Sequence, residues 1–212
     1  MIWWLDLLDM EGVFDRVVRV DGAKKRGTVY SDASEHGLGF VLFLSDCVIF
    51  ASVSVQGEDY QDIAIWEAAA IILVYRCVWM RLQQCLLLFL VDNNGVLSGV
   101  VKGWSRSDII NVMVGASWKV CAVEAVAPWY ERVPSSPNLS DAPSRLFDEA
   151  LGAAESREQW LRSVRSAIDS DLPLFECRAS WRPGGPGGLL GRLVAGDIIS
   201  ALQRCEWPAA EE

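Results

Sequence analysis

The chain has 212 residues, of which 51% are hydrophobic and 22% charged, and it carries a net charge of −9 at pH 7. This length and apolar content suit one globular domain with a substantial core and exclude a disordered tail. The acidic balance excludes a nucleic-acid binder that works by bulk electrostatic attraction.

Membrane and secretory classes are also disfavoured. Glu67, Arg76 and Arg81 interrupt the longest apolar stretch, which therefore falls short of the roughly 18 residues needed to span a bilayer. The first residues lack a basic region and meet acids early, unlike a signal peptide. The six cysteines form no C-x-x-C pair, which indicates reduced thiols. We expect an intracellular protein, cytoplasmic or nuclear, without membrane contact.

The lead-in segment, residues 1–27, ends in a basic run, Lys24 to Arg26. This run is interpreted as a solvated loop, with a phosphate contact as the alternative. Three strands are then predicted from apolar runs that shift toward period-2 alternation, at about residues 28–32, 39–44 and 47–55. The short turns between them favour an antiparallel meander.

A long helix is predicted at 58–84, where apolar residues recur at helical spacing without Gly or Pro. The continuous apolar run at 86–91 is typical of a strand buried on both faces. Two helices, a strand and a further helix follow, at about 95–102, 107–120, 123–133 and from 138 onward.

The character of the sequence changes near residue 150. An amphipathic helix is predicted at 155–168, a Pro/Gly-rich linker at 183–188 and a last helix at 189–207. The chain is thus divided into the lead-in segment, an α/β domain at 28–150 and a helical tail at 151–212.

Four acids occupy positions that folding alone does not explain, because an unpaired buried charge is costly. Asp32 ends the first strand, Glu67 lies in the most apolar helical stretch, Asp92 directly follows the fourth strand, and Asp141 opens the helix after the fifth. Sites in open sheets form at the carboxyl ends of strands. Two divalent cations would balance four clustered carboxylates, and oxygen-only ligands select Mg²⁺ or Mn²⁺. Two such ions support phosphodiester cleavage.

The motifs around these acids resemble the ribonuclease H family. They are Asp32-Ala-Ser-x-x-Gly-x-Gly39, the helical Glu67, Asp92-Asn-Asn, and Val133-Pro-Ser-Ser-Pro-Asn138 continuing to Asp141-Ala-Pro-Ser-Arg145. The last motif is similar to the V-P-S-x-x-N-x-x-D-x-x-S-R string of tyrosine-recombinase retrotransposons, the DIRS group. The resemblance covers about residues 28–150 and implies a ribonuclease H-like α/β fold. Its five-stranded mixed sheet has three antiparallel strands followed by parallel additions, flanked by helices and followed here by the helical tail.

The resemblance implies a hydrolase that cuts the RNA strand of RNA–DNA hybrids. Asp32, Glu67, Asp92 and Asp141 would be the catalytic acids and the ligands of two Mg²⁺ or Mn²⁺ ions. Ser34, Asn94 and Asn138 would contact the nucleic acid, because the family reads 2′-hydroxyls across the wide minor groove. A neighbouring reverse-transcriptase or recombinase module would be a partner.

The chain departs from the family in two respects. No histidine lies between residues 37 and 212, where many members carry one before the last aspartate. No dense basic cluster lies between Asp92 and Asp141, so modest hybrid affinity is expected. Two alternatives stay open: an inactive remnant of this fold serving as a structural or nucleic-acid-binding module, and a related metal nuclease acting on DNA. Gly37 and Gly39 are interpreted as residues of a tight hairpin.

Overall fold

The computed structural model describes residues 25–55, 62–136, 138–146, 153–167 and 172–177. The predictions for residues 1–24, for the linker at 183–188 and for the helix at 189–207 lie outside the described residues.

A mixed sheet forms the centre of the fold, with the strand order β5-β4-β1-β2-β3-β6. The first three strands are antiparallel neighbours, β4 is parallel to β1, β5 is parallel to β4, and β6 is parallel to β3. The strands are β1 Lys25–Ala33, β2 Gly37–Leu44, β3 Val48–Ser54, β4 Cys85–Val91, β5 Ala127–Arg132 and β6 Leu174–Glu176. The predicted α/β fold and mixed sheet are confirmed. The sixth strand was missed because three residues carry no readable periodicity.

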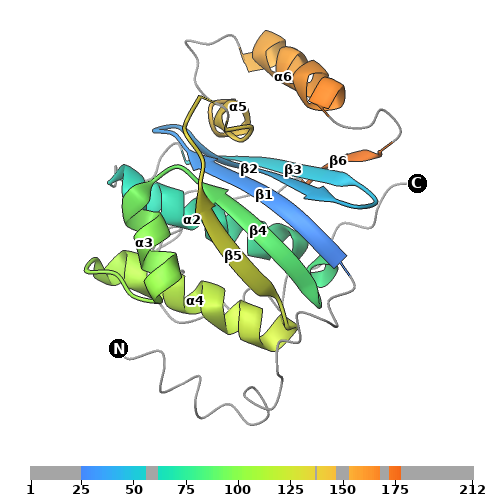
Figure 1. The fold of residues 1–212 in the computed structure, drawn as a ribbon. Helices are drawn as coiled ribbons and strands as arrows, with labels where there is room; N and C mark the ends of the chain where they lie inside the picture. Colours follow the sequence, from blue (N-terminus) through green and yellow to red (C-terminus); the bar gives the residue numbers. More distant parts are fainter. Residues whose placement is uncertain (1–24, 56–61, 137, 147–152, 168–171, 178–212) are drawn as a thin grey trace.

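Helices cover the two faces of the sheet unequally (Figure 1). The inner face, as we call it, packs against α2, α3 and α4, whereas α5 and α6 lie over the opposite, outer face. The helices are α2 Ile63–Val78, α3 Asn94–Lys102, α4 Asp108–Glu124, α5 Asp141–Ser144 and α6 Ala153–Ala167, with a 3₁₀ turn η2 at Trp79–Arg81.

The first long helix is shorter than its predicted range of 58–84. Asp62 caps its start, because the Asp62 carboxylate accepts a hydrogen bond from the Ala64 backbone N–H. After Val78 the chain tightens into η2, and Gln84 adopts a positive φ of 56° before β4 begins. Residues 63–78 form the most buried helix of the described chain, with an apolar core contact on nearly every side.

The fifth strand begins four residues later than predicted. Residues 123 and 124 continue helix α4, and Ala125 ends that helix in the left-handed conformation at φ 53°. An apolar run at the end of a helix looks like the start of a strand when only periodicity is read. The start of the first strand also moves: Lys25 and Arg26, expected in a loop, are exposed residues of β1.

β4 is buried on one face only within the described structure, which corrects the prediction of burial on both. Its side chains alternate between buried and half-buried positions along the strand. Leu86, Leu88 and Leu90 point to the outer face, and Trp129 of β5, paired with Leu88, is 67% exposed there. The continuous apolar run predicted the strand correctly, but it did not predict that the outer face of the strand is only half-buried.

Helix α6 and strand β6 pack on the same sheet as the rest of the domain. Trp160 contacts the Phe50 ring edge-to-face at 4.8 Å between centroids, and its Nε1 donates a hydrogen bond to the Leu139 carbonyl at 3.0 Å. Val164 lies in the same apolar cluster. The division into three parts stays a prediction, but this portion of the tail holds α5 against the sheet.

The segment Ile63–Arg81 passes a length-and-hydropathy test for a membrane span. Of its most apolar window, 72% is buried inside the fold. This is the burial expected of a core helix.

Candidate metal centre

Two neighbouring parallel strands bring Asp32 and Asp92 to one edge of the sheet. β1 and β4 pair Tyr30 with Leu90, and each aspartate lies two residues further along its own strand direction. Helix α2 crosses the inner face and adds Glu67. One carboxylate oxygen from each of these three acids lies within 4.8 Å of the other two. Three of the four predicted acids therefore meet.

Two acids of this cluster are almost closed to solvent, Asp32 at 4% and Glu67 at 5% exposed, whereas Asp92 is half-buried. Burial, together with the charges of Asp32 and Asp92, raises the pKa of Glu67 to about 9, while the Ala33 backbone hydrogen bond opposes this rise. Burial also raises the pKa of Asp32 to about 6, against the lowering effect of the Ser144 hydroxyl. Glu67 therefore keeps its proton at neutral pH unless a positive charge lies beside it.

Two atoms of the cluster lack the partners that buried polar groups normally have. Among the described residues, four buried polar side-chain atoms have no hydrogen-bond partner, and Glu67 Oε2 and Asp92 Oδ1 are two of them. Either a proton shared between these carboxyls or a bound cation would resolve this. A buried set of oxygen donors without histidine or cysteine suits a hard divalent ion such as Mg²⁺ or Mn²⁺.

Asp141 lies beside this group but outside it. Its side chain is 44% exposed, and its Oδ1 accepts a hydrogen bond from Arg145 Nε at 2.7 Å. Its charge is nevertheless among the causes that raise the pKa of Asp32. The fourth acid is thus close to the cluster, with its carboxylate paired to an arginine.

The three residues predicted to touch nucleic acid have different surroundings. Asn94 is exposed at the first turn of α3. Asn138 is buried, and its Nδ2 donates to Asp32 Oδ1 at 3.4 Å and to the Ser31 carbonyl at 3.5 Å. The Ser34 hydroxyl donates to the Ser144 carbonyl at 2.7 Å and accepts from the Gly37 backbone N–H. Asn138 therefore makes its contacts inside the fold and Ser34 from a half-buried position, while Asn94 is exposed.

The residue that sequence reasoning missed is Ser144. Its hydroxyl lies 2.5 Å from Asp32 Oδ2, although 112 residues separate the two in the chain. Ser144 belongs to the motif that ends in Arg145, but the motif alone gave this serine no role. Gly39 also gains a role beyond the hairpin, because α5 rests directly on it.

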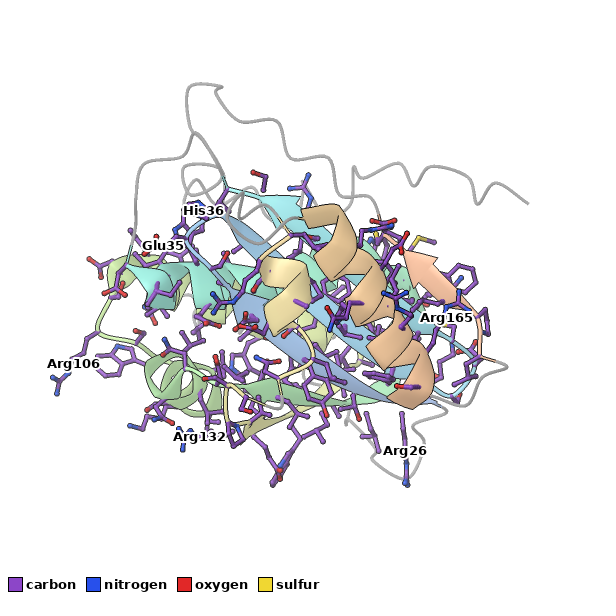
Figure 2. The ribbon with its side chains drawn as sticks, turned by 90° about the horizontal axis from the view of Figure 1, so that it is seen from above. Arg26, Glu35, His36, Arg106, Arg132 and Arg165 are labelled. Carbon is purple, nitrogen blue, oxygen red and sulfur yellow. The ribbon has the colours of Figure 1, made fainter. Side chains whose placement is uncertain are left out.

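Charged side chains lie toward both ends of the sheet. Figure 2 shows Arg106 and Arg132 toward the end of the sheet that carries Glu35 and His36, while Arg26 and Arg165 lie toward the other end. His36 is the single histidine of the chain. It lies in the β1–β2 turn, where its backbone N–H donates to Ser34 Oγ.

No known sequence-family profile matches the chain, and no curated protein matches it. Several solved structures are similar in fold. RNase H1 from the halophilic archaeon Halobacterium salinarum is 15% identical, with 61% of this chain and 98% of that chain covered and a TM-score of 0.42. The N-terminal RNase H domain of rv2228c from Mycobacterium tuberculosis is 12% identical, with 66% and 99% covered and a TM-score of 0.43. LC9-RNase H1 is 17% identical, with 76% and 92% covered and a TM-score of 0.39.

Proposed function

We propose that this chain is a metal-dependent endonuclease that hydrolyses the RNA strand of RNA–DNA hybrids, derived from a retroelement of the DIRS type. The observation that carries the proposal is the oxygen-only cluster of buried Asp32, buried Glu67 and half-buried Asp92 at the carboxyl edge of parallel strands. The sequence motifs that resemble ribonuclease H are the ones that supply these acids.

In this proposal the three clustered acids hold two divalent ions, and Asp141 completes the set when its carboxylate turns from Arg145 toward the cluster. Bound ions would supply an activated water and would stabilise the leaving oxygen of a phosphodiester. The protein's own contribution is orientation: the strand ends fix Asp32 and Asp92, and the buried helix α2 fixes Glu67.

The substrate preference rests on the resemblance and on the charge of the chain. Residues 28–150 contain 14 acids and 7 bases, so bulk attraction for phosphates is weak. Recognition would therefore depend on local contacts to 2′-hydroxyls, which distinguish RNA from DNA. Asn94 is the exposed candidate for such a contact. A retroelement nuclease would act inside the cell, beside a reverse-transcriptase or recombinase module.

Two observations favour the alternative of an inactive remnant. Asp141 is held by Arg145 outside the cluster, and no histidine follows His36. A chain in which Asp141 never joined the other acids would keep the fold and lose cleavage.

The deciding experiment is cleavage of labelled substrates in Mg²⁺ or Mn²⁺ by the wild type, Asp92→Asn and Asp108→Asn. Asp108 is an exposed residue in the first turn of α4 and provides a matched control. We expect the RNA strand of a hybrid to be cut by the wild type and Asp108→Asn but not by Asp92→Asn. A folded wild type that cuts no hybrid in either metal would support the remnant, and cleavage of duplex DNA instead would indicate a DNA nuclease.

A further inference from the structure

Helix α5 rests on a row of residues that crosses three strands of the sheet. β1 and β2 pair Asp32 with Gly39, and β2 and β3 pair Gly39 with Ser52. Residues paired directly across antiparallel strands point to the same face. Asp32, Gly39 and Ser52 therefore all face the outer side, where α5 lies (Figure 1).

The contact between α5 and this row is unusually close. A Cβ atom on Gly39 would lie 2.5 Å from the Ser144 backbone nitrogen and 2.7 Å from the Pro143 carbonyl carbon, so only glycine fits. On either side of it, Ser52 Oγ donates to the Pro143 carbonyl at 2.5 Å and Ser34 Oγ donates to the Ser144 carbonyl at 2.7 Å. The Gly39 contact sets the height of the α5 backbone above Asp32, and the two hydrogen bonds add to the docking of α5 on the sheet.

At that height, the Ser144 hydroxyl reaches two acceptors, Asp32 Oδ2 at 2.5 Å and the Asp141 carbonyl at 2.9 Å. A hydroxyl has one proton and can donate to only one of them at a time. The carboxylate is the stronger acceptor, because hydrogen bonds to ionised oxygens are shorter and stronger than neutral ones. Ser144 is fully buried, so water does not compete for this bond.

Asn138 restrains the other oxygen of the same carboxylate. Its Oδ1 accepts hydrogen bonds from the Ser140 hydroxyl at 2.7 Å and the Ser140 backbone N–H at 3.2 Å. This orients the amide so that Nδ2 points at Asp32 Oδ1, 3.4 Å away. One donor on each carboxylate oxygen still leaves lone pairs free for a cation.

We propose that Ser144 is a positioning residue for the metal centre, which fixes the Asp32 carboxylate and ties it to the segment that carries Asp141. This inference rests on the proposed function, since it assigns a task within the same site. Ser144 does not bind the ion; it acts through Asp32. The close contact between Gly39 and the backbone of α5 sets the height at which it acts.

The test is a calorimetric titration of Mn²⁺ into the full-length chain without nucleic acid, for the wild type and Ser144→Ala. Removal of a group that orients a ligand typically costs about 10–100-fold in metal affinity, and we expect a loss in that range. The free energy of unfolding of each protein, measured in parallel with a chelator present, shows whether the protein is folded during the titration.

Two variants separate positioning from a general loss of stability. Ser52→Ala removes a hydrogen bond that docks α5 and leaves the contact between Ser144 and Asp32 in place. Ser117→Ala removes a buried hydroxyl of α4 that donates a hydrogen bond to the Met113 carbonyl. We expect both to bind Mn²⁺ within about threefold of the wild type, in contrast to the loss that ligand-orienting groups produce.

The outcomes are distinguishable. A wild type that binds Mn²⁺ and cuts hybrid, together with a Ser144→Ala variant of unchanged affinity, overturns the role of Ser144 and leaves the proposed function intact. Equal losses in Ser144→Ala and Ser52→Ala also overturn it, because docking alone would then explain the effect. A folded wild type that binds no Mn²⁺ overturns both the metal centre and this inference.

Discussion

Asp32 and Gly39 lie directly opposite each other on β1 and β2, and both face the backbone of α5. One supplies a carboxylate to the acidic cluster, and the other supplies the space that lets α5 reach that carboxylate. Any change at Gly39 should therefore affect a site to which it contributes no atom.

Substitution Gly39→Ala should lower the free energy of unfolding by about 1–3 kcal/mol, because an added methyl in a packed contact forces the backbone to move. The neighbours are backbone atoms of Pro143 and Ser144, which cannot rotate away. Urea denaturation measures the effect. Gly99→Ala is the control: the nearest atoms to its Cβ lie 3.6 Å away, and a helical alanine should stabilise by roughly 0.5–1 kcal/mol. Equal effects of the two substitutions would contradict the close contact.

The stability of the metal-free chain should fall as the pH rises from about 4.5 to 9. The folded chain retains a proton on Glu67, whose pKa is raised to about 9 by burial, whereas the unfolded chain releases it near the ordinary value of 4.5. The folded state then binds more protons than the unfolded state, which gives a negative slope. The raised pKa of Asp32 adds to this slope between pH 3.8 and about pH 6.

Substitution Glu67→Gln removes that titration, so its stability curve should be flatter. At pH 8 in a chelator we expect Glu67→Gln to be more stable than the wild type by about 1–3 kcal/mol. Urea denaturation across the pH range checks this, with the exposed Glu131→Gln as a control. Parallel curves for wild type and Glu67→Gln would show that Glu67 is ionised in the folded chain. Addition of Mn²⁺ should stabilise the wild type selectively.

Substitution Asp141→Asn should separate the fourth acid from the other three. The side chain of Asp141 is 44% exposed and its carboxylate is paired with Arg145. The substitution should therefore change the free energy of unfolding by less than about 0.5 kcal/mol. In a Mn²⁺ titration without nucleic acid we expect affinity within about threefold of the wild type, against a loss of at least about tenfold for Asp92→Asn. A larger loss of Mn²⁺ affinity in Asp141→Asn than in Asp92→Asn would show that Asp141 binds the ion directly in the absence of nucleic acid.

Substitution Tyr75→Phe should reduce stability without touching the metal centre. The fully buried Tyr75 hydroxyl lies 3.1 Å from Cys121 Sγ and 3.4 Å from the Tyr130 hydroxyl. Burial raises the pKa of Cys121 to about 12, so it stays a neutral thiol. Loss of this hydrogen-bonded group should cost about 1 kcal/mol. The free energy of unfolding and the Mn²⁺ affinity are measured on the same variant. A change in Mn²⁺ affinity would show that the Tyr75 contacts and the metal centre are not independent.

The positions of three acids could be predicted from the sequence because each follows from a local rule. Asp32 and Asp92 stand at the ends of apolar runs, and Glu67 interrupts an apolar helix. Parallel pairing of the first and fourth strands then brings the two aspartates together. All five cysteines of the described residues are free thiols, as their scattered spacing indicated.

The details that complete the site could not be predicted in this way. The contact between Ser144 and Asp32 joins residues 112 positions apart, and it exists only because Gly39, on a third segment, has no side chain. Asp141 was expected among the ligands, but its place depends on an ion pair with Arg145 four residues later. Such features arise from the docking of whole segments, which no local pattern encodes.

The outer face of β4 has a practical consequence for handling this protein. Leu86, Leu88 and Leu90 form a half-buried apolar row beside the indole of Trp129, which is exposed. Exposed apolar surface is a typical cause of association between molecules. A polar replacement such as Leu88→Thr should therefore reduce self-association at high protein concentration. It should leave the acidic cluster unchanged, because Asp32, Glu67 and Asp92 meet at the carboxyl ends of the strands and not on this face.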